Sequence, residues 1–536
     1  MPYAAPRYAV TPPPSGKAHH PAVVVGGGLV GLTLALDLAQ RGVAVVVLDD
    51  DDTVSTGSRA ICFAKRTLEI FGRLGLGPRM LAKGITWNRG RVFFGERQLF
   101  DFDLLPEDGH EYPAFINLQQ YYAEQWLVEA CEATGLVDLR WQHKVSAVDS
   151  RADGAAVTVE TASGPYALTT DWLVAADGAR SFVRGCLDLP FVGKTFRDRF
   201  LIADVVMRAE FPTERWFWFD PPFHRNQSAL LHKQPDDIWR IDLQLGWDAD
   251  PEEERRPERV IPRVRAMLGP DVPFELEWVS VYTFRCRRLE RFVHGRVVFV
   301  GDSAHQVSPF GARGGNGGVQ DADNLGWKLA AVIQGQSDPA LVHTYDDERI
   351  VAADENILHS TRATDFITPK SDAARAYRDA ALALAAHHAF ARPLVNSGRL
   401  SRPARLLDSP LNARDSNAWP GCLPPGTPAA DAPMTCAGAP DWLLRRLAGP
   451  GFSLLVFGPA TPDVPGVTTV RIAPDALHDV RGLAAQRYGA MPGACVLLRP
   501  DQHVAALFRR FDRDRVAAAV AHAMGLAASA RLERVA

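Results

Sequence analysis

The segment 22–50, AVVVGGGLVGLTLALDLAQRGVAVVVLDD, combines an apolar strand, a glycine-rich turn, an amphipathic helix and a second apolar strand. The turn contains the pattern G-x-G-x-x-G as Gly26, Gly28 and Gly31. The second strand ends in acidic residues about twenty positions after the glycines, the spacing at which an acid meets the ribose of a bound dinucleotide. The hexapeptide alone is a weak signal, but this context predicts a dinucleotide-binding βαβ unit.

Each position of the turn has its own expected role. Gly26 permits the tight turn, Gly28 lets a pyrophosphate approach the backbone, and Gly31 lets the helix pack on the strand. Amide groups at the helix start, at Leu29 and Val30, are expected to face the phosphates, because the first N–H groups of a helix have no partner within it. A purely structural βαβ turn is the alternative.

The acidic end of the second strand is expected to bind the ribose. Asp49 is the first candidate to accept hydrogen bonds from the ribose diol, and Asp50 is the second, because strand ends are uncertain by a residue or two. Asp51 and Asp52 are interpreted as a solvated run of charge. The fingerprint does not separate FAD from NAD.

A second glycine-rich segment lies at 301–332, GDSAHQVSPFGARGGNGGVQDADNLGWKLAAV, where five of the eight residues 311–318 are glycine. Glycine loses more backbone entropy on folding than other residues, so this density predicts a ligand that approaches the main chain closely. A third motif, DWLVAADGARSFVRGCL at 171–187, is a strand that ends in Asp-Gly and leads into a helix.

Composition is that of a soluble globular enzyme. The 536 residues are 47% hydrophobic and 23% charged, and the net charge is -4, which gives no basic footprint for nucleic acid. The seven cysteines include no CxxC pair and no cluster with metal-ligand spacing, so no metal is expected and a cytoplasmic location fits best. Polar residues interrupt the longest apolar stretch, 22–48, which excludes a membrane span there.

The order of patterns along the chain predicts an α/β protein of several domains. The Pro-rich segment 1–20 is expected to be a disordered arm and not a signal peptide. Residues 21–185 and 293–396 are expected to form one discontinuous domain, interrupted by a β-rich domain at 186–292. A linker at 397–430 and a small α/β domain at 431–530 follow.

Taken in their order along the chain, 22–50, 171–187 and 301–332, the three motifs resemble the signatures of FAD-dependent aromatic hydroxylases of the para-hydroxybenzoate hydroxylase type over residues 20–395. The chain looks closest to the branch like 3-(3-hydroxyphenyl)propionate hydroxylase, whose members often add a thioredoxin-like C-terminal domain without redox cysteines. The resemblance implies a Rossmann-type FAD-binding domain, a β-sheet domain for the substrate and a thioredoxin-like tail with a structural or interfacial role.

The resemblance also implies roles for single residues around the FAD. Asp302 would bind the ribityl chain and Arg59 the pyrophosphate, while Gln120, or Gln119 if the match is off by one, would bind the ribityl or phosphate portion. Asp177 would brace its turn, with Arg180 or Arg184 meeting the phosphates of NAD(P)H. The turn that approaches the isoalloxazine ring would be formed by Gly311, Gly314, Gly315 and Asn316.

Pro309, Arg313 and Tyr282 are the expected catalytic residues. Pro309 matches a family proline whose carbonyl lies near the reactive flavin carbon, and Arg313 places a cation near the anionic reduced flavin or the substrate; a surface arginine is the alternative. His305 is interpreted as an architectural hydrogen-bonding residue. In the β-rich domain, Tyr282 is a candidate polar contact to the substrate, as are His232 and Arg240.

The resemblance implies a single-component FAD-dependent monooxygenase. It would hydroxylate a phenolic or other aromatic small molecule with NAD(P)H and O2, through a flavin C4a-hydroperoxide. The chain has no second G-x-G-x-x-G at a strand–helix junction, so NAD(P)H is expected to bind transiently. An FAD-dependent oxidoreductase or oxidase without oxygen insertion is the alternative, and a cofactor-stabilised scaffold with a binding tail is a third. Apolar helical stretches near the C-terminus permit a homodimer.

Overall fold

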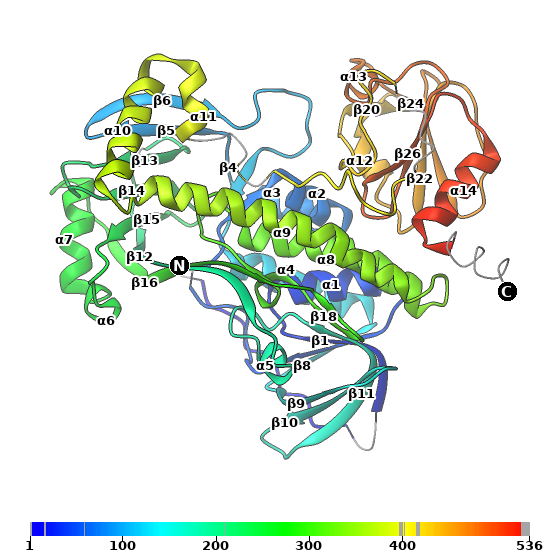
Figure 1. Cartoon of the computed structure of the whole chain (residues 1–536), viewed down its shortest axis with the longest axis horizontal. Helices are drawn as coiled ribbons and strands as arrows, with labels where there is room; N and C mark the ends of the chain where they lie inside the picture. Colours follow the sequence, from blue (N-terminus) through cyan, green and yellow to red (C-terminus); the bar gives the residue numbers. More distant parts are fainter. Residues whose placement is uncertain are drawn as a thin grey trace.

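The computed structural model describes residues 3–14, 18–57, 59–209, 211–395, 400, 402–413 and 419–526. The described chain is a mixed α/β protein with four sheets, as the sequence predicts for its class. Figure 1 shows the central sheet and its helices in the middle and below, a second large sheet to one side, and the C-terminal unit on the other.

The central sheet is built around the first strand of the glycine motif. Its strands run in the order β17 (Val293–His294), β18 (Val297–Phe299), β11 (Tyr166–Ala175), β1 (Ala18–Val25), β2 (Val45–Asp49) and β8 (Val137–Trp141), and β9 (Lys144–Ser150) and β10 (Ala155–Glu160) extend it beside β11. From β18 to β8 neighbouring strands are parallel, so the loops after β1, β11 and β18 meet at one edge. The three sequence motifs therefore converge there, where α/β sheets bind their ligands.

Long helices cover this sheet because their apolar faces match its buried strands. The helices are α1 (Leu29–Gln40), α4 (Gln120–Thr134), α8 (Gly314–Ile333) and α9 (Ala340–Ile367), with the shorter α2 (Lys65–Arg73), α3 (Gly77–Lys83) and α5 (Phe182–Cys186) around them. Strand residues such as Val24 and Val47 share one buried core with Leu32 of α1 and Leu325 of α8. A small sheet of β3 (Cys62–Ala64), β7 (Phe115–Asn117) and β4 (Ile85–Trp87) lies beside the second glycine-rich turn.

The second large sheet, here called the substrate sheet, is formed mostly by the β-rich segment. Its order is β19 (His305–Gln306), β16 (Glu275–Leu289), β12 (Phe191–Val206), β15 (Ile238–Leu245), β14 (Ser228–Lys233), β13 (Arg215–Phe219), β5 (Arg89–Phe94) and β6 (Arg97–Asp103). Strands β5 and β6 come from the first half of the chain, so the expected contiguous domain 186–292 does not contain the whole sheet. The segment β5–β6 joins it because β5 pairs in parallel with β13.

The two faces of the substrate sheet differ. One face packs on α7 (Pro257–Leu268) through residues such as Trp239, Ile241 and Val264. The opposite face meets α10 (Asp372–His387) and the segment at Phe310. The short helices α6 (Pro251–Glu254) and α11 (Arg392–Val395) complete this part of the chain.

The N-terminal arm is ordered where the structure describes it, which corrects the expectation of disorder for residues 3–14. Tyr3 stacks on Tyr121 with ring centroids 3.9 Å apart, and Tyr8 stacks on Trp141 at 4.5 Å. The main chain of Tyr8 also donates to the Asp52 carbonyl at 2.8 Å. Aromatic residues and backbone hydrogen bonds anchor a segment that has no secondary structure of its own, and β1 already begins at Ala18.

The C-terminal unit is built on a sheet of its own, the fourth of the described chain. Its order is β21 (Ala439–Trp442), β20 (Pro433–Cys436), β24 (Leu477–His478), β23 (Val467–Ile472), β22 (Phe452–Phe457), β25 (Cys495–Leu498) and β26 (Val504–Phe508), with helices α12 (Leu443–Arg446), α13 (Leu483–Tyr488) and α14 (Arg513–Ala523). The expected linker 397–430 lies partly outside the described residues. Its described part is packed: Leu406, Leu411 and Trp419 are all buried. Among the described residues, no helix combines the length and apolar character needed to cross a bilayer.

Candidate cofactor and substrate site

The three glycines of the first motif differ in what surrounds them. At Gly26, with φ +109°, a Cβ atom would lie 2.5 Å from the Ala176 carbonyl oxygen, and at Gly31 it would lie 2.0 Å from the Gly26 oxygen. At Gly28 the nearest protein atom would be a Glu124 carboxylate oxygen at 3.7 Å. The protein's own packing therefore requires glycine at the first and third positions, while the second is open to a ligand.

The acid at the end of β2 supports the turn from beneath. The two carboxylate oxygens of Asp49 accept hydrogen bonds from the amides of Gly27 at 2.5 Å and Asp51 at 2.8 Å. Burial raises the pKa of Asp49 to about 6, although these two amides favour the charged form. Asp50 is exposed and forms no hydrogen bond with a described residue through its side chain.

Glu124 is a residue that the sequence interpretation missed. Its buried carboxylate accepts the amide of Leu29 at 3.0 Å and the amide of Ser55 at 2.8 Å. Leu29 was expected to present this amide to a phosphate. In this structure the amide donates to Glu124 instead, so one of the free N–H groups at the start of α1 already has a partner in the protein. Glu124 lies one helical turn after Gln120, whose side chain donates to it at 2.7 Å. The spacing i, i+4 on α4 is the signal that could have drawn attention to it.

The second glycine-rich turn leads into α8. Gly311 has φ +98° and Ala312 has φ +54°, so the chain reverses through left-handed conformations before the helix begins at Gly314. A Cβ atom at Gly314 would have only ordinary contacts, at 3.7 Å from Val307 and 4.0 Å from the Asp302 carboxylate. As at Gly28, the protein itself does not require glycine at this position, and the nearby Asp302 side chain is exposed.

Asn316 holds this turn in place with its side chain. Its amide oxygen accepts from the Ala64 amide at 2.9 Å, and its nitrogen donates to the carbonyls of Cys62 at 2.8 Å and Ala312 at 2.6 Å. Any contact of Asn316 with a cofactor would therefore come from its main chain. The hydrogen bonds tie the turn to β3, across from the substrate sheet.

His305 lies beneath α8 in a buried ionic cluster. Its Nε2 is 2.6 Å from the Asp321 carboxylate, which also accepts from Arg349 at 2.7 Å and from the amide of Gly301 at 3.0 Å. The charges of His305 and Arg349 outweigh burial and hold the pKa of Asp321 below its ordinary value. This geometry agrees with the architectural interpretation of His305.

The other expected cofactor residues surround the same edge of the sheet. Gln120 accepts the amide of Ala60 at 3.0 Å, next to Arg59, whose side chain is exposed. Asp177 accepts the amide of Val183 at 3.0 Å and so braces its turn.

The two arginines after Asp177 differ. Arg184 donates to the carbonyls of Ser303 at 3.1 Å and Ala179 at 3.2 Å, so it ties the second motif to the third. Arg180 is exposed.

The expected catalytic residues lie where the turn meets the substrate sheet. Pro309 is exposed, and its carbonyl accepts the amide of Ala312 at 3.1 Å. Arg313 is 5% exposed and donates to Asn356 at 3.5 Å, so the surface alternative for this arginine is wrong. Tyr282 on β16 is 42% exposed. Desolvation of its hydroxyl by the surrounding protein, together with the charge of Asp302, raises the pKa of Tyr282 to about 12, so the phenol keeps its proton.

Aromatic side chains form the wall next to Pro309. Phe310 packs edge-on against Phe200 and Phe284, with ring centroids 5.1 Å and 5.2 Å away. Tyr282 lies beside Phe284 at 5.7 Å. The three phenylalanines are buried and hold Pro309 against the substrate sheet, while the partly exposed ring of Tyr282 is left to contact a flat apolar ligand.

A polar row crosses the middle of the same face. His232 and Arg240 are buried partners on β14 and β15, and Arg240 donates to Asp204 at 3.2 Å and to the Arg59 carbonyl at 3.1 Å. Burial and the neighbouring arginines hold the pKa of His232 well below its ordinary value, so it is neutral. Arg215 and Asp242, which the sequence interpretation did not single out, belong to the same row.

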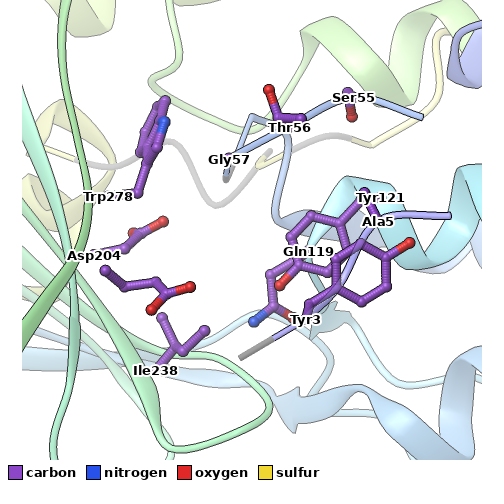
Figure 2. A pocket seen from close by; sticks show the side chains of 11 residues that line it. Tyr3, Ala5, Ser55, Thr56, Gly57, Gln119, Tyr121, Asp204, Ile238 and Trp278 are labelled. Carbon is purple, nitrogen blue, oxygen red and sulfur yellow. The ribbon is translucent and has the colours of Figure 1, made fainter. Parts of the chain in front are cut away.

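A cavity of about 140 Å³ lies at the edge of this face, where the N-terminal arm meets the substrate sheet. Figure 2 shows Asp204, Ile238 and Trp278 on one side of it and the stacked rings of Tyr3 and Tyr121 on the other. A larger groove of about 860 Å³ separates the α2 region from the C-terminal unit. The expected FAD residues gather at neither place but around the two glycine turns.

The residues present fit FAD. Gly28 and Gly314 have only ordinary van der Waals contacts where a Cβ atom would lie, and the exposed side chains of Asp302 and Arg59 lie along the same edge. A parallel sheet whose first strand leads into such a turn is the arrangement of a dinucleotide-binding protein.

Comparison with known proteins assigns the family. Residues 19–360 match the model of the FAD binding domain family, and the chain belongs to that family. A 6-methylpretetramide 4-monooxygenase of Streptomyces rimosus is 32% identical over 91% of this chain and 90% of its own length. A flavin-dependent monooxygenase of Mycobacteroides abscessus is 29% identical over 90% of this chain and 96% of its own. A para-nitrophenol 4-monooxygenase of Pseudomonas sp. strain WBC-3 is 32% identical over 67% of this chain and 90% of its own length.

Solved structures show the same architecture. The flavin-dependent monooxygenase PieE, solved with FAD and substrate, aligns with a TM-score of 0.81 over 96% of this chain and 100% of its own, at 22% identity. The p-nitrophenol 4-monooxygenase PnpA of Pseudomonas putida DLL-E4 aligns with a TM-score of 0.64 over 72% of this chain and 99% of its own, at 28% identity. The expected resemblance to FAD-dependent aromatic hydroxylases is thus confirmed.

Proposed function

We propose that this protein is a single-component FAD-dependent monooxygenase that hydroxylates a phenolic or other aromatic small molecule. In the overall reaction an aromatic C–H becomes C–OH while NAD(P)H, a proton and O2 give NAD(P)+ and water. Bound FAD supplies the redox chemistry, as electron acceptor from NAD(P)H and as the site of O2 activation. The observation that carries the proposal is the glycine backbone at Gly314, where the protein itself does not require glycine, in the turn whose Phe310 packs on Phe284 of the substrate sheet.

The chain's own residues would bind and orient the reactants. Asp49 would accept hydrogen bonds from the ribose hydroxyls, and Asp302 would bind the ribityl chain. The glycine backbone at Gly28 would allow the pyrophosphate to approach. The N–H groups at the start of α8 would stabilise negative charge on the reduced ring, because the helix dipole is positive there. The side chains of Phe200, Phe284 and Phe310 would exclude water from the reaction space.

Two further assignments belong to this proposal. The C-terminal unit would be thioredoxin-like: β22 pairs in parallel with β23, the antiparallel pair β25–β26 follows, and α14 ends the described unit. All seven cysteines are free, which supports a reducing, cytoplasmic location.

The test begins with the purified full chain loaded with FAD. We expect a flavin absorption spectrum, and NAD(P)H consumption that a hydroxylated aromatic compound stimulates, with a product heavier by one oxygen atom. Consumption that yields only hydrogen peroxide with every compound of a broad phenol panel would favour an oxidase instead. Failure to retain any FAD would reject both readings.

A further inference from the structure

The polar row of the substrate sheet contains two charged groups without partners. The side chains of Arg215 on β13 and Asp242 on β15 form no hydrogen bond and no ion pair with any described residue, although both residues are partly buried. One carboxylate oxygen of Asp242 is fully buried and has no hydrogen-bonding partner. A buried charge without a partner is costly, so such groups on a sheet face that contacts the expected cofactor residues point to polar atoms that arrive with a ligand.

Strand register places both groups on the face turned toward the cofactor residues. On β15, Trp239, Ile241 and Leu243 point into the core with α7, so Arg240 and Asp242 point the other way. Cross-strand pairing continues this face through Leu230 and His232 of β14, which oppose Asp242 and Arg240, and on to β13. Arg215 falls on the same face because it is two residues from Phe217, the partner of Leu230.

Strand β3, which holds the second glycine-rich turn, lies near this face. The thiol of Cys62 on β3 lies within electrostatic range of Arg215, Arg240 and Asp242. The Cys62 carbonyl accepts the hydrogen bond from Asn316 that fixes the turn. The two unpartnered charges therefore face the place where the flavin ring is proposed to lie.

The other charges of the row are already neutralised. Arg240 is paired with Asp204 and with the Arg59 carbonyl. Burial lowers the pKa of the Arg215 guanidinium and raises the pKa of Asp242 to about 6, which are the shifts of groups that lack close partners. Arg215 and Asp242 act on each other at a distance but leave room between them.

We propose that Arg215 and Asp242 form a two-point subsite that selects the aromatic substrate: Arg215 binds an anionic oxygen of the substrate, and Asp242 accepts a hydrogen bond from a ring hydroxyl. The substrate class is then a hydroxylated aromatic compound that also carries an acidic oxygen, either a carboxylate or an ionised phenol or enol. This inference rests on the proposed function. It deepens that function by naming the chemistry that the cleft recognises.

The test measures ligand binding rather than turnover. The full chain, loaded with FAD, is titrated with 3-hydroxybenzoate and 3-hydroxy-2-naphthoate, with the methyl ester of each, with benzoate and with 4-nitrophenol. Dissociation constants are followed by the change in the flavin spectrum and by calorimetry. The acid–ester pairs isolate the anionic oxygen, benzoate lacks the hydroxyl, and 4-nitrophenol separates an ionised phenol from a carboxylate.

For the wild type we expect at least one anionic compound to bind about tenfold or more tightly than its neutral ester. This is the change in dissociation constant that the loss of about one charge-assisted hydrogen bond produces. Arg215→Met should remove this preference and Arg215→Lys should keep part of it. Asp242→Asn should weaken the binding of the hydroxylated compounds several-fold and leave the affinity for benzoate unchanged. Arg208→Met, which removes a guanidinium that is 94% exposed, is the matched control and should change nothing.

Equal binding of acids and esters by the wild type would overturn the inference without any variant, as would failure of every anionic compound to bind. Retention of the preference in Arg215→Met would also overturn it. These outcomes are independent of turnover. Hydroxylation of neutral phenols without a preference for anions would leave the proposed function standing, whereas selective anion binding without oxygen insertion would contradict only that function.

Discussion

Gly28 and Gly31 are three residues apart, but their neighbours differ enough to make a matched pair of variants informative. Gly28 has φ -86° and room for a methyl group, so Gly28→Ala should leave the unfolding free energy of the apoprotein within about 0.5 kcal/mol of wild type. The methyl group would meet the pyrophosphate instead, and FAD binding should weaken at least tenfold. Gly31→Ala should destabilise the apoprotein by about 1–3 kcal/mol, because its Cβ atom collides with the Gly26 carbonyl. Urea unfolding and FAD titration of both variants measure the two effects, and tight FAD binding by Gly28→Ala would contradict the assignment.

Asp49 gives FAD binding a pH dependence with a definite sign. Its pKa in the apoprotein is raised from 3.8 to about 6, and ribose hydroxyl donors would favour the carboxylate and lower that pKa. FAD binding then releases a proton, so affinity should rise as the pH increases toward 6, by at most about tenfold per pH unit, and level off near pH 7. The stability of the apoprotein should change in the opposite direction and fall as the pH rises from about 4 to 6, because in that range the folded chain binds more protons than the unfolded chain. FAD titrations from pH 5 to 8 test this: Asp49→Asn should flatten the profile, and if Asp50→Asn flattens it instead, Asp50 binds the ribose.

At the residue scale the sequence predicts best where backbone geometry dictates the residue type. The spacing of the three motif glycines was sufficient to assign the tight turn to Gly26 and helix packing to Gly31, and their calculated Cβ collisions match those roles. Glu124, Arg215 and Asp242 could not be found in this way. Their importance depends on what a folded neighbour does or does not supply, and alternation along a strand does not tell which face is turned toward a ligand.

At the scale of elements, strands with a clear period of two were predictable. The β-rich segment expected at 186–292 contains β15 and β16, and the α/β segment expected at 431–530 contains β22, β23 and β25. The membership of β5 and β6 in the substrate sheet was not predictable, because β5 pairs with β13, more than a hundred residues later in the sequence, and β6 joins the sheet through β5. Likewise, the N-terminal arm has no periodic pattern, and its order depends on tyrosines that stack on distant rings.

Helix α8 depends on the ionic cluster beneath it, and this dependence can be tested. Asp321 is fully buried and accepts from Arg349, His305 and the Gly301 amide. Asp321→Asn should lower the unfolding free energy by about 3 kcal/mol or more, because it leaves the buried Arg349 without its counter-ion. FAD content should fall as well, since the N-terminus of α8 forms part of the cofactor turn. Gln320→Ala, at the neighbouring half-buried position, should stay within about 0.5 kcal/mol. If both variants retain wild-type stability in urea, the cluster does not support the helix.

The whole molecule is joined by a second buried ionic network, which couples the FAD-binding part to the C-terminal unit. Glu348 of α9 lies 2.6 Å from Lys328 of α8 and 2.5 Å from Arg499 of the C-terminal unit, and Arg499 in turn lies 2.6 Å from Asp501. All four side chains are fully buried. An apolar layer continues the contact, with Trp327 of α8 packed among residues of β22. We therefore expect the two units to unfold together.

Arg499→Met tests this coupling at a distance from the cofactor. The substitution leaves Glu348 and Asp501 in the interior without the guanidinium that bridges them, so that Lys328 and His503 are the remaining ion-pair partners; this should cost about 3–5 kcal/mol. If the units unfold as one, the temperature at which flavin fluorescence appears should fall together with the calorimetric transition, although no atom of Arg499 contacts the proposed cofactor residues. Arg471→Gln removes an exposed ion pair with Asp475 on the same unit and should change the unfolding free energy by at most about 1 kcal/mol. A lowered calorimetric transition with unchanged flavin release would mean that the C-terminal unit folds independently, and its buried contacts with α8 and α9 would then contribute nothing to holding FAD.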